Sequence, residues 1–278
     1  MAYAKIIISG KSIDYYRFQL EPPLLGTPRN VDKDKKKEKI EADPNNSLYR
    51  TKRIINELIN CNAWEWHKKN GRPYPPYFLT LTFKENIQDL KEANREFSKF
   101  IQRYNYELFG EKKARLKYLG VPEFQKRGAI HYHVIIFNLP YKKKRVYRTL
   151  FKLWGKGRVE LKIVVTMKSL INYLSKYLTK DLLDNKLSNK KRYFCSRNLK
   201  KPVVIKDFGF AERVIKNIDK SRIVFQKNYY NEYLGEAQHI IYSMRKDEDI
   251  LDLELDWGDK NHLESLINKE NEKELWNI

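Results

Sequence analysis

The sequence predicts an α+β fold in which an antiparallel sheet carries helices on one face, with an N-terminal extension and a C-terminal helical tail. Apolar residues alternate with others over Tyr77–Phe83, which is the period of a strand. Apolar residues recur every three or four positions over Asp89–Leu108, which is the period of an amphipathic helix. Two further β-type runs, Leu116–Phe124 and Ala129–Phe137, flank a tight polar turn and should pair as an antiparallel hairpin.

The other elements of the main domain follow from the same patterns. Ser47–His67 has the spacing of a leading helix, and the basic stretch Tyr141–Trp154 runs into a short helix. A strand is expected over Arg158–Val165, and a helix over Met167–Leu183. The resulting order, β-α-β-β-α-β-α, favours an antiparallel sheet with its helices packed on one face.

Both ends of the chain differ in composition from its centre. Two β-type runs, Lys5–Ser9 and Ser12–Gln19, precede the stretch Glu21–Asn46, which is rich in Pro, Asp and Lys and resembles a solvated linker. Asp247–Ile278 is acidic and is interpreted as a separate helical tail. A chain of 278 residues can bury one sizeable core with appendages. We therefore expect three segments, residues 1–46, 47–205 and 206–278.

The charge of the chain indicates a polyanionic partner. Lysine and arginine number 56 against 35 acidic residues, which gives a formal net charge of +21. Such an excess attracts polyanions. The basic residues are interleaved with 19 tyrosines and 13 phenylalanines, whose rings suit stacking on unpaired bases. Single-stranded nucleic acid is therefore the favoured partner.

Several classes of protein are disfavoured. Cys61 and Cys195 form no CxxC pair, so neither a disulfide framework nor a structural zinc site is expected, and a reducing cytoplasm, that of a host cell, is the expected compartment. No apolar run reaches the length of a membrane span, and Met1–Gly10 lacks the order of a signal peptide. No GxxxxGK[ST] loop occurs, so we expect no nucleotide cofactor, and strand unwinding must come from another protein.

Two histidines in one predicted strand form a candidate metal site. His131 and His133 are two residues apart and therefore point to the same face of the strand, with Tyr132 on the opposite face. An HxH pair is weak evidence alone, because two packed or exposed histidines on a strand are the commoner finding.

A carboxylate on the neighbouring strand strengthens this hypothesis. If the hairpin turn is centred on Arg127, Glu123 lies directly opposite His131 on the same face. A different turn would instead bring Gln125 toward the site, although the parity of the three candidate ligands argues against a slip of one residue. Two imidazoles and one carboxylate suit a divalent ion acting as Lewis acid, and Mg²⁺ or Mn²⁺ best fits phosphate chemistry.

A polar row on the preceding strand projects to one side of the sheet. Phe78, Thr80 and Thr82 alternate with the apolar row of that strand. They can line the candidate metal site or serve only as β-forming residues, and we assign them no catalytic role.

A tyrosine stripe is the second chemical signal. In YLSKYLTK, spacings of three, four and seven place Tyr173, Lys176, Tyr177 and Lys180 on one face of the predicted helix. Tyrosine stripes usually fill a core or a surface. The two lysines point instead to nucleophilic chemistry, because ammonium groups and a metal-polarised phosphate favour the phenolate of a tyrosine whose pKa is ordinarily about 10. Either lysine could neutralise charge on a phosphoryl group.

Taken together, these residues resemble the three motifs of the HUH endonuclease superfamily, specifically rolling-circle replication initiators of small phages and plasmids. YFLTLTF resembles the first motif, GAIHYHVIIF with Glu123 eight residues before His131 resembles the histidine motif, and YLSKYLTK resembles the tyrosine motif. The match covers about Ser47–Pro202. The helix with two tyrosines is especially similar to the A proteins of isometric single-stranded DNA phages.

The resemblance implies a function and a mechanism. It implies a ferredoxin-like, RRM-like core and site-specific nicking and rejoining of single-stranded DNA at a replication origin, which can be a hairpin. Tyr173 and Tyr177 would alternate as nucleophiles, although either could act alone. Each nick would leave a 5′-phosphotyrosine and a free 3′-hydroxyl for a host DNA polymerase, with a host helicase as a further partner.

Basic residues outside the motifs are expected to hold the DNA. Lys190–Pro202 resembles the basic stretch that follows the tyrosine motif in such initiators. The predicted DNA-binding residues are Lys126, Arg127, Lys191, Arg192, Arg197, Lys200 and Lys201.

Two alternatives remain. The same chemistry serves plasmid-mobilising relaxases, which usually carry a third histidine in place of Glu123, and tyrosine transposases of mobile elements. A noncatalytic RRM-like module would instead use Tyr132, Phe137 and basic residues to stack on RNA or DNA.

Overall fold

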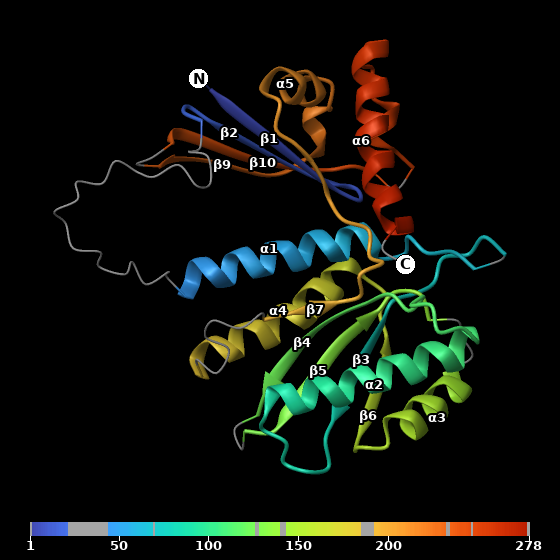
Figure 1. The fold of residues 1–278 in the computed structure, drawn as a ribbon. Helices are drawn as coiled ribbons and strands as arrows, with labels where there is room; N and C mark the ends of the chain where they lie inside the picture. Colours follow the sequence, from blue (N-terminus) through green and yellow to red (C-terminus); the bar gives the residue numbers. More distant parts are fainter. Residues whose placement is uncertain are drawn as a thin grey trace. The chain divides into compact units, whose positions relative to one another are not determined.

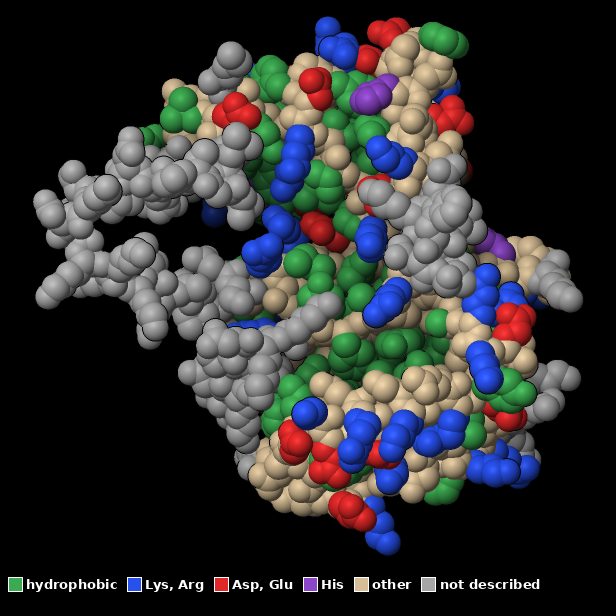
Figure 2. All heavy atoms as spheres, viewed as in Figure 1, with side chains coloured by type: hydrophobic (Ala, Val, Ile, Leu, Met, Phe, Trp, Pro, Cys, Tyr) green, Lys and Arg blue, Asp and Glu red, His purple; other side chains and the backbone are tan. Residues whose placement is uncertain are grey.

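The computed structural model forms two compact units. It describes residues 2–21, 44–68, 70–125, 128–139, 143–184, 192–231, 234–245 and 247–276. Unit 1 combines the N-terminal residues up to 43 with residues 201–272, and unit 2 contains residues 44–200 with the last six residues of the chain. Lysine and arginine side chains are spread over the surfaces of both units (Figure 2).

Unit 2 is built on a five-stranded antiparallel sheet in the order β6-β3-β5-β4-β7 (Figure 1). β3 and β4 both pair antiparallel with β5, so the helix between them connects two parallel strands that are not neighbours. Its elements are α1 (Pro44–Asn62), β3 (Tyr77–Thr82), α2 (Leu90–Phe109), β4 (Tyr118–Phe124), β5 (Ile130–Ile136), α3 (Lys143–Trp154), β6 (Val159–Ile163), α4 (Met167–Asp184) and β7 (Phe194–Cys195).

Helices cover both faces of this sheet (Figure 1). Leu79 and Tyr132 point to the face where α2 and α3 pack, whereas Phe78 and Ile135 point to the face where α1 and α4 pack. The predicted α+β antiparallel fold is confirmed, but the second helical layer differs from the one-sided packing expected. It forms because alternate residues of the strands are apolar on this face as well, and their burial is favourable.

Local signals fix the ends of the long helix of this unit. Asp89 caps α2 by accepting a hydrogen bond from the backbone N–H of Lys91 at 3.0 Å. Gly110 ends the helix with φ 71°, a left-handed conformation that glycine adopts without steric cost. These signals place α2 within a residue or two of the predicted helix.

Unit 1 contains the second antiparallel sheet, in the order β8-β1-β2-β10-β9. The predicted N-terminal β-hairpin is confirmed as β1 and β2, which pair across Gly10. The elements are β1 (Tyr3–Ser9), β2 (Ser12–Phe18), β8 (Val203–Ile205), α5 (Phe208–Lys216), η1 (Lys220–Arg222), β9 (Ile223–Asn231), β10 (Gly235–Ser243), η2 (Ile250–Asp252) and α6 (Trp257–Trp276).

The two ends of the chain meet in unit 1. β2 of the N-terminal segment pairs with β10 along seven residues. The acidic end is helical, as predicted, but Leu263 of α6 is fully buried in the core of this unit and Arg213 of α5 pairs with Asp259. The predicted limits of the three segments stay a prediction, and most of the predicted linker lies outside the described residues. No described helix has both the length and the apolar character needed to cross a bilayer.

Candidate metal centre and tyrosine helix

The hairpin of unit 2 brings the three predicted ligands together. Glu123 of β4 lies opposite His131 of β5, which is the predicted register, and Thr80 of β3 lies opposite His133. One ligand atom each of Glu123, His131 and His133 lies within 4.8 Å of the others. All three are buried, with 5%, 8% and 3% of their surface exposed, so any charge placed here needs a partner.

Hydrogen bonds orient these side chains. His133 Nε2 lies 2.6 Å from Glu123 Oε2, and Gln125 Nε2 lies 3.3 Å from His131 Nδ1. Two imidazole nitrogens and a carboxylate oxygen form a donor set that suits Mg²⁺, Mn²⁺ and other divalent ions of borderline hardness. The donor set therefore fits the expected metal, which Glu123, His131 and His133 would hold.

The predicted tyrosine helix, α4, packs beside this centre. Leu170 and Leu174 are fully buried against the sheet, which fixes the rotation of the helix. That rotation places the half-buried Tyr173 and Tyr177 next to His133. Neither phenol is sealed in the interior, so both remain candidates for chemistry.

The two tyrosines contact His133 in different ways. The Tyr173 hydroxyl lies 3.2 Å from His133 Nδ1 and 2.8 Å from Thr80 Oγ1. Its ring stacks on Phe78 with the centroids 3.7 Å apart. The Tyr177 ring lies flat on the imidazole of His133, with the centroids 3.4 Å apart and an angle of 10° between the rings. Tyr173 thus holds the edge of the imidazole, while Tyr177 covers its face.

Burial raises the pKa of the Tyr173 phenol well above its usual value. The hydrogen bond from Thr80 acts in the opposite direction but does not offset the loss of solvation. The phenol is therefore neutral near pH 7 and can share a hydrogen bond with Thr80.

The predicted basic residues are placed unevenly. Lys176 is exposed, with its Nζ 5.9 Å from the centroid of the Tyr177 ring. Lys180 belongs to α4, but its side chain lies outside the described residues, as do Lys126, Arg127 and Lys191. The remaining predicted contacts are half-buried Arg192 and Lys200 and exposed Arg197 and Lys201.

Sequence reasoning left two residues of the site without a role. Thr80 contacts both Tyr173 and His133, at 2.8 Å and 3.3 Å, and Gln125 contacts His131. The signal for Thr80 was present, because it belongs to the polar row of its strand. The neighbouring strand register that turns this row into contacts could not be read from that segment alone.

Burial weighs against one alternative function. The noncatalytic stacking module would need Tyr132 and Phe137 at the surface, but both are fully buried. Tyr132 packs on Phe97 in the core and donates a hydrogen bond to Asn94. Neither ring can receive a nucleobase without unfolding the core.

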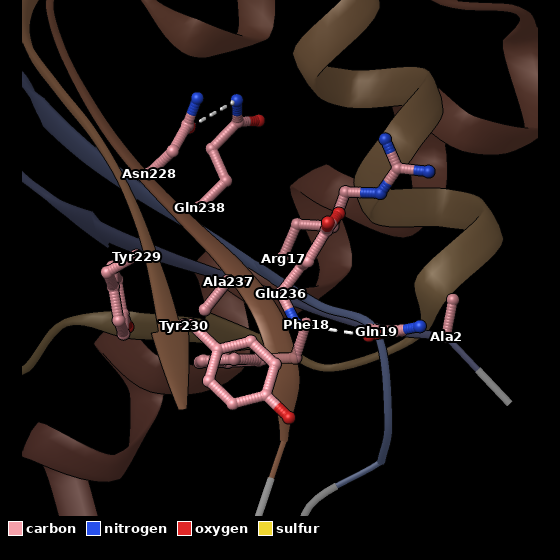
Figure 3. A pocket seen from close by; sticks show the side chains of 10 residues that line it. All are labelled: Ala2, Arg17, Phe18, Gln19, Asn228, Tyr229, Tyr230, Glu236, Ala237 and Gln238. Atoms are coloured by element: carbon pink, nitrogen blue, oxygen red, sulfur yellow. Dashed lines mark hydrogen bonds between the residues drawn. The ribbon is translucent and has the colours of Figure 1, made fainter. Parts of the chain in front are cut away.

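A wider hollow, of about 770 Å³, lies in unit 1 and contains none of the predicted site residues. Figure 3 shows its polar lining at the end of β2, β9 and β10. Gln238 donates a hydrogen bond to Asn228 at 3.1 Å, and Gln19 accepts one from the backbone of Glu236. Because the titratable and nucleophilic groups of the site are elsewhere, we place no chemistry in this hollow.

The fold and the site define a class: an α+β protein with a candidate divalent-metal centre beside a helix that carries paired tyrosines. Residues 76–182, less than half of the chain, match the family model of the replication-associated proteins of the ORF2 type. This segment includes the three candidate ligands and both tyrosines. No curated protein and no solved structure matches the chain. The predicted resemblance to replication initiators is confirmed at the level of this family, which indicates a role in replication and in binding DNA.

Proposed function

We propose that the protein initiates rolling-circle replication by nicking and rejoining single-stranded DNA through a tyrosine. One observation carries the proposal: the ligand atoms of Glu123, His131 and His133 lie within 4.8 Å of one another, directly beside the tyrosines of α4. A packed core has no need for two imidazoles, a carboxylate and two phenols at one point, whereas phosphoryl transfer uses all of them.

The protein residues have separate roles in this proposal. A divalent ion bound by the three ligands would supply Lewis-acid stabilisation to the scissile phosphate. A phenolic oxygen attacks phosphorus, and the bond from phosphorus to the 3′ oxygen breaks. The phenol loses one proton and the 3′ oxygen gains one, so the step leaves a 5′-phosphotyrosine and a 3′-hydroxyl and needs no further reactant.

The two tyrosines are proposed to act in order. The Tyr173 hydroxyl contacts His133 on Nδ1, the ring atom that faces away from Glu123, and so orients the imidazole. Burial also raises the pKa of this phenol, which disfavours its phenolate. Tyr177 lies beside the exposed ammonium of Lys176, which favours its phenolate. We therefore assign the first attack to Tyr177 and the return reaction to Tyr173.

Basic residues complete the proposed site. Lys176, one helical turn from Tyr173, and Lys180 would neutralise the phosphoryl oxygens. The remaining contacts to the DNA backbone are assigned to Lys126, Arg127, Lys191, Arg192, Arg197, Lys200 and Lys201.

The test is formation of a covalent adduct. Wild-type protein is incubated with Mn²⁺ and single-stranded fragments that tile its own replicon, and adducts are detected as a shift on a denaturing gel. One fragment should give an adduct, which Tyr173→Phe with Tyr177→Phe should abolish while leaving DNA binding intact. Tyr106→Phe, an exposed tyrosine of α2, is the matched control. Nicking by the double variant would refute the assignment of the nucleophiles, and binding without any adduct would favour a noncatalytic module.

A further inference from the structure

A second hollow of unit 2, of about 570 Å³, lies at the opposite end of the sheet from the metal centre. It opens where β4 begins and β5 ends, next to Lys117 and Asn138. Glu123 lies near the other end of β4, six residues from Lys117. At about 3.3 Å per residue, the hollow is therefore on the order of 20 Å from the metal centre along the strand.

The lining of this hollow combines cations with aromatic rings. Its residues include Trp66, Tyr74, Phe109, Lys113, Arg115 and Lys117. The Lys117 ammonium lies 3.5 Å from the centroid of the Trp66 ring, and the Arg115 guanidinium lies 5.3 Å from that of Phe109. Lys113 and Arg115 are exposed, while Tyr74 and Phe109 are half-buried beneath the surface.

The wall that carries the two exposed cations is held in place from below. Asn105 of α2 is buried, and its amide nitrogen donates to the backbone oxygens of Glu111 and Lys113 at 3.1 and 2.7 Å. Its amide oxygen accepts from the backbone of Arg115 and Leu116 at 2.8 and 3.0 Å. Four hydrogen bonds to one side chain fix the loop, so the cations are presented without a large loss of backbone entropy on binding.

Two polar atoms of the lining remain available for a ligand or for water. Trp66 Nε1, a donor, and Asn198 Oδ1, an acceptor, are buried without a hydrogen-bond partner in the described part of the chain. Buried polar groups in native proteins are almost always satisfied. A donor and an acceptor left in one lining therefore point to a polar occupant or an ordered water.

We propose that this hollow binds a segment of single-stranded DNA remote from the nick, with phosphates on Lys113 and Arg115 and an unpaired base against Tyr74 and Phe109. Cations beside aromatic rings match the two components of a single strand, because phosphate is anionic and an unpaired base offers a ring face. A duplex hides its base faces and would use only the cations. The proposal rests on the proposed function, since it gives the nicked strand a second point of attachment.

Charge reversal at the hollow provides the test. Lys113→Glu with Arg115→Glu is compared with Arg148→Glu and Lys152→Glu, two exposed residues of α3, which change the net charge equally. Binding of labelled single strands of increasing length is measured by fluorescence anisotropy without divalent ions. The hollow variant should bind long strands at least tenfold more weakly and short strands normally. Losing two phosphate contacts should lower the salt slope by about 1.4.

A second variant covers the case in which charge reversal disturbs the loop. Tyr74→Leu keeps the charge but removes a stacking surface, and it should weaken binding of single strands about threefold or more while leaving duplex binding unchanged. Thermal melting verifies that each variant is folded.

The outcomes separate this inference from the proposed function. Equal weakening by the two charge-reversed variants, or unchanged binding by folded Tyr74→Leu, would overturn the hollow as a single-strand site even if the protein forms the adduct. Length-dependent binding through the hollow without any adduct would support the site and contradict the nicking function.

Discussion

Replacing Thr80 with valine tests whether the contacts at the centre position the tyrosine helix. The change keeps the shape of the side chain but removes the hydroxyl that lies 2.8 Å from the Tyr173 hydroxyl and 3.3 Å from His133 Nδ1. The Tyr173 hydroxyl then keeps its contact with His133 at 3.2 Å. A net contribution of about 1 kcal/mol is typical of one such hydrogen bond.

This magnitude predicts two measurable effects. The free energy of unfolding in urea should fall by about 1 kcal/mol. If the same energy holds the tyrosine and the imidazole in their working orientation, the single-turnover rate of adduct formation should fall about fivefold. Thr80 does not touch the DNA in this scheme, so the dissociation constant for DNA should not change.

The same strand offers a matched control. Thr82 is the next residue on the same face, opposite His131, and Thr82→Val makes the identical chemical change. It should alter the unfolding free energy and the rate by clearly less than Thr80→Val. Equal effects of the two substitutions on stability and rate would refute the positioning role of Thr80.

Three further predictions concern other parts of the molecule. Chelation should abolish nicking, and a 100-fold excess of Mn²⁺ over its dissociation constant should stabilise the wild type by about 2.7 kcal/mol but Glu123→Gln clearly less, in thermal melts; equal stabilisation would exclude this carboxylate as a ligand. Hydrogen bonds from Arg213 lower the pKa of Asp259, so their stabilisation is present above the unfolded pKa and disappears as the pH falls through the lowered value. Asp259→Asn should therefore flatten the loss of stability below about pH 4 in melts across pH, and an unchanged profile would contradict the ion pair. Asn105→Ala, which leaves four backbone groups without their partner, should lower the unfolding free energy by about 3 kcal/mol, and a loss below about 1 kcal/mol would show that the loop holds itself.

The elements of unit 2 could be predicted because their signals are local. Alternation over Tyr77–Phe83 and the spacing of apolar residues over Asp89–Leu108 correspond to β3 and α2 within about a residue. The cap Asp89 and the ending Gly110 are encoded beside the helix they limit. The α1 and α4 layer was not expected, because an apolar strand face does not reveal which segment of the chain will cover it.

The candidate site was predicted in part for a similar reason. A short hairpin has few possible registers, so the pairing of Glu123 with His131 followed from parity and the position of the turn. The contact between Thr80 and Tyr173 joins residues 93 positions apart. It depends on how α4 is rotated against the sheet, which Leu170 and Leu174 decide by their burial.

By itself, the sequence determined the periods of the strands and helices, the excess of positive charge, and the three candidate ligands on one hairpin, because each of these is a property of neighbouring residues. The tertiary structure alone decided that the N-terminal hairpin and the acidic helix share one unit, that Tyr132 is buried, and that a basic and aromatic hollow lies at the far end of the sheet. Those features arise when distant segments pack together to bury apolar surface, and the energy of that packing is not written in any single stretch of the chain.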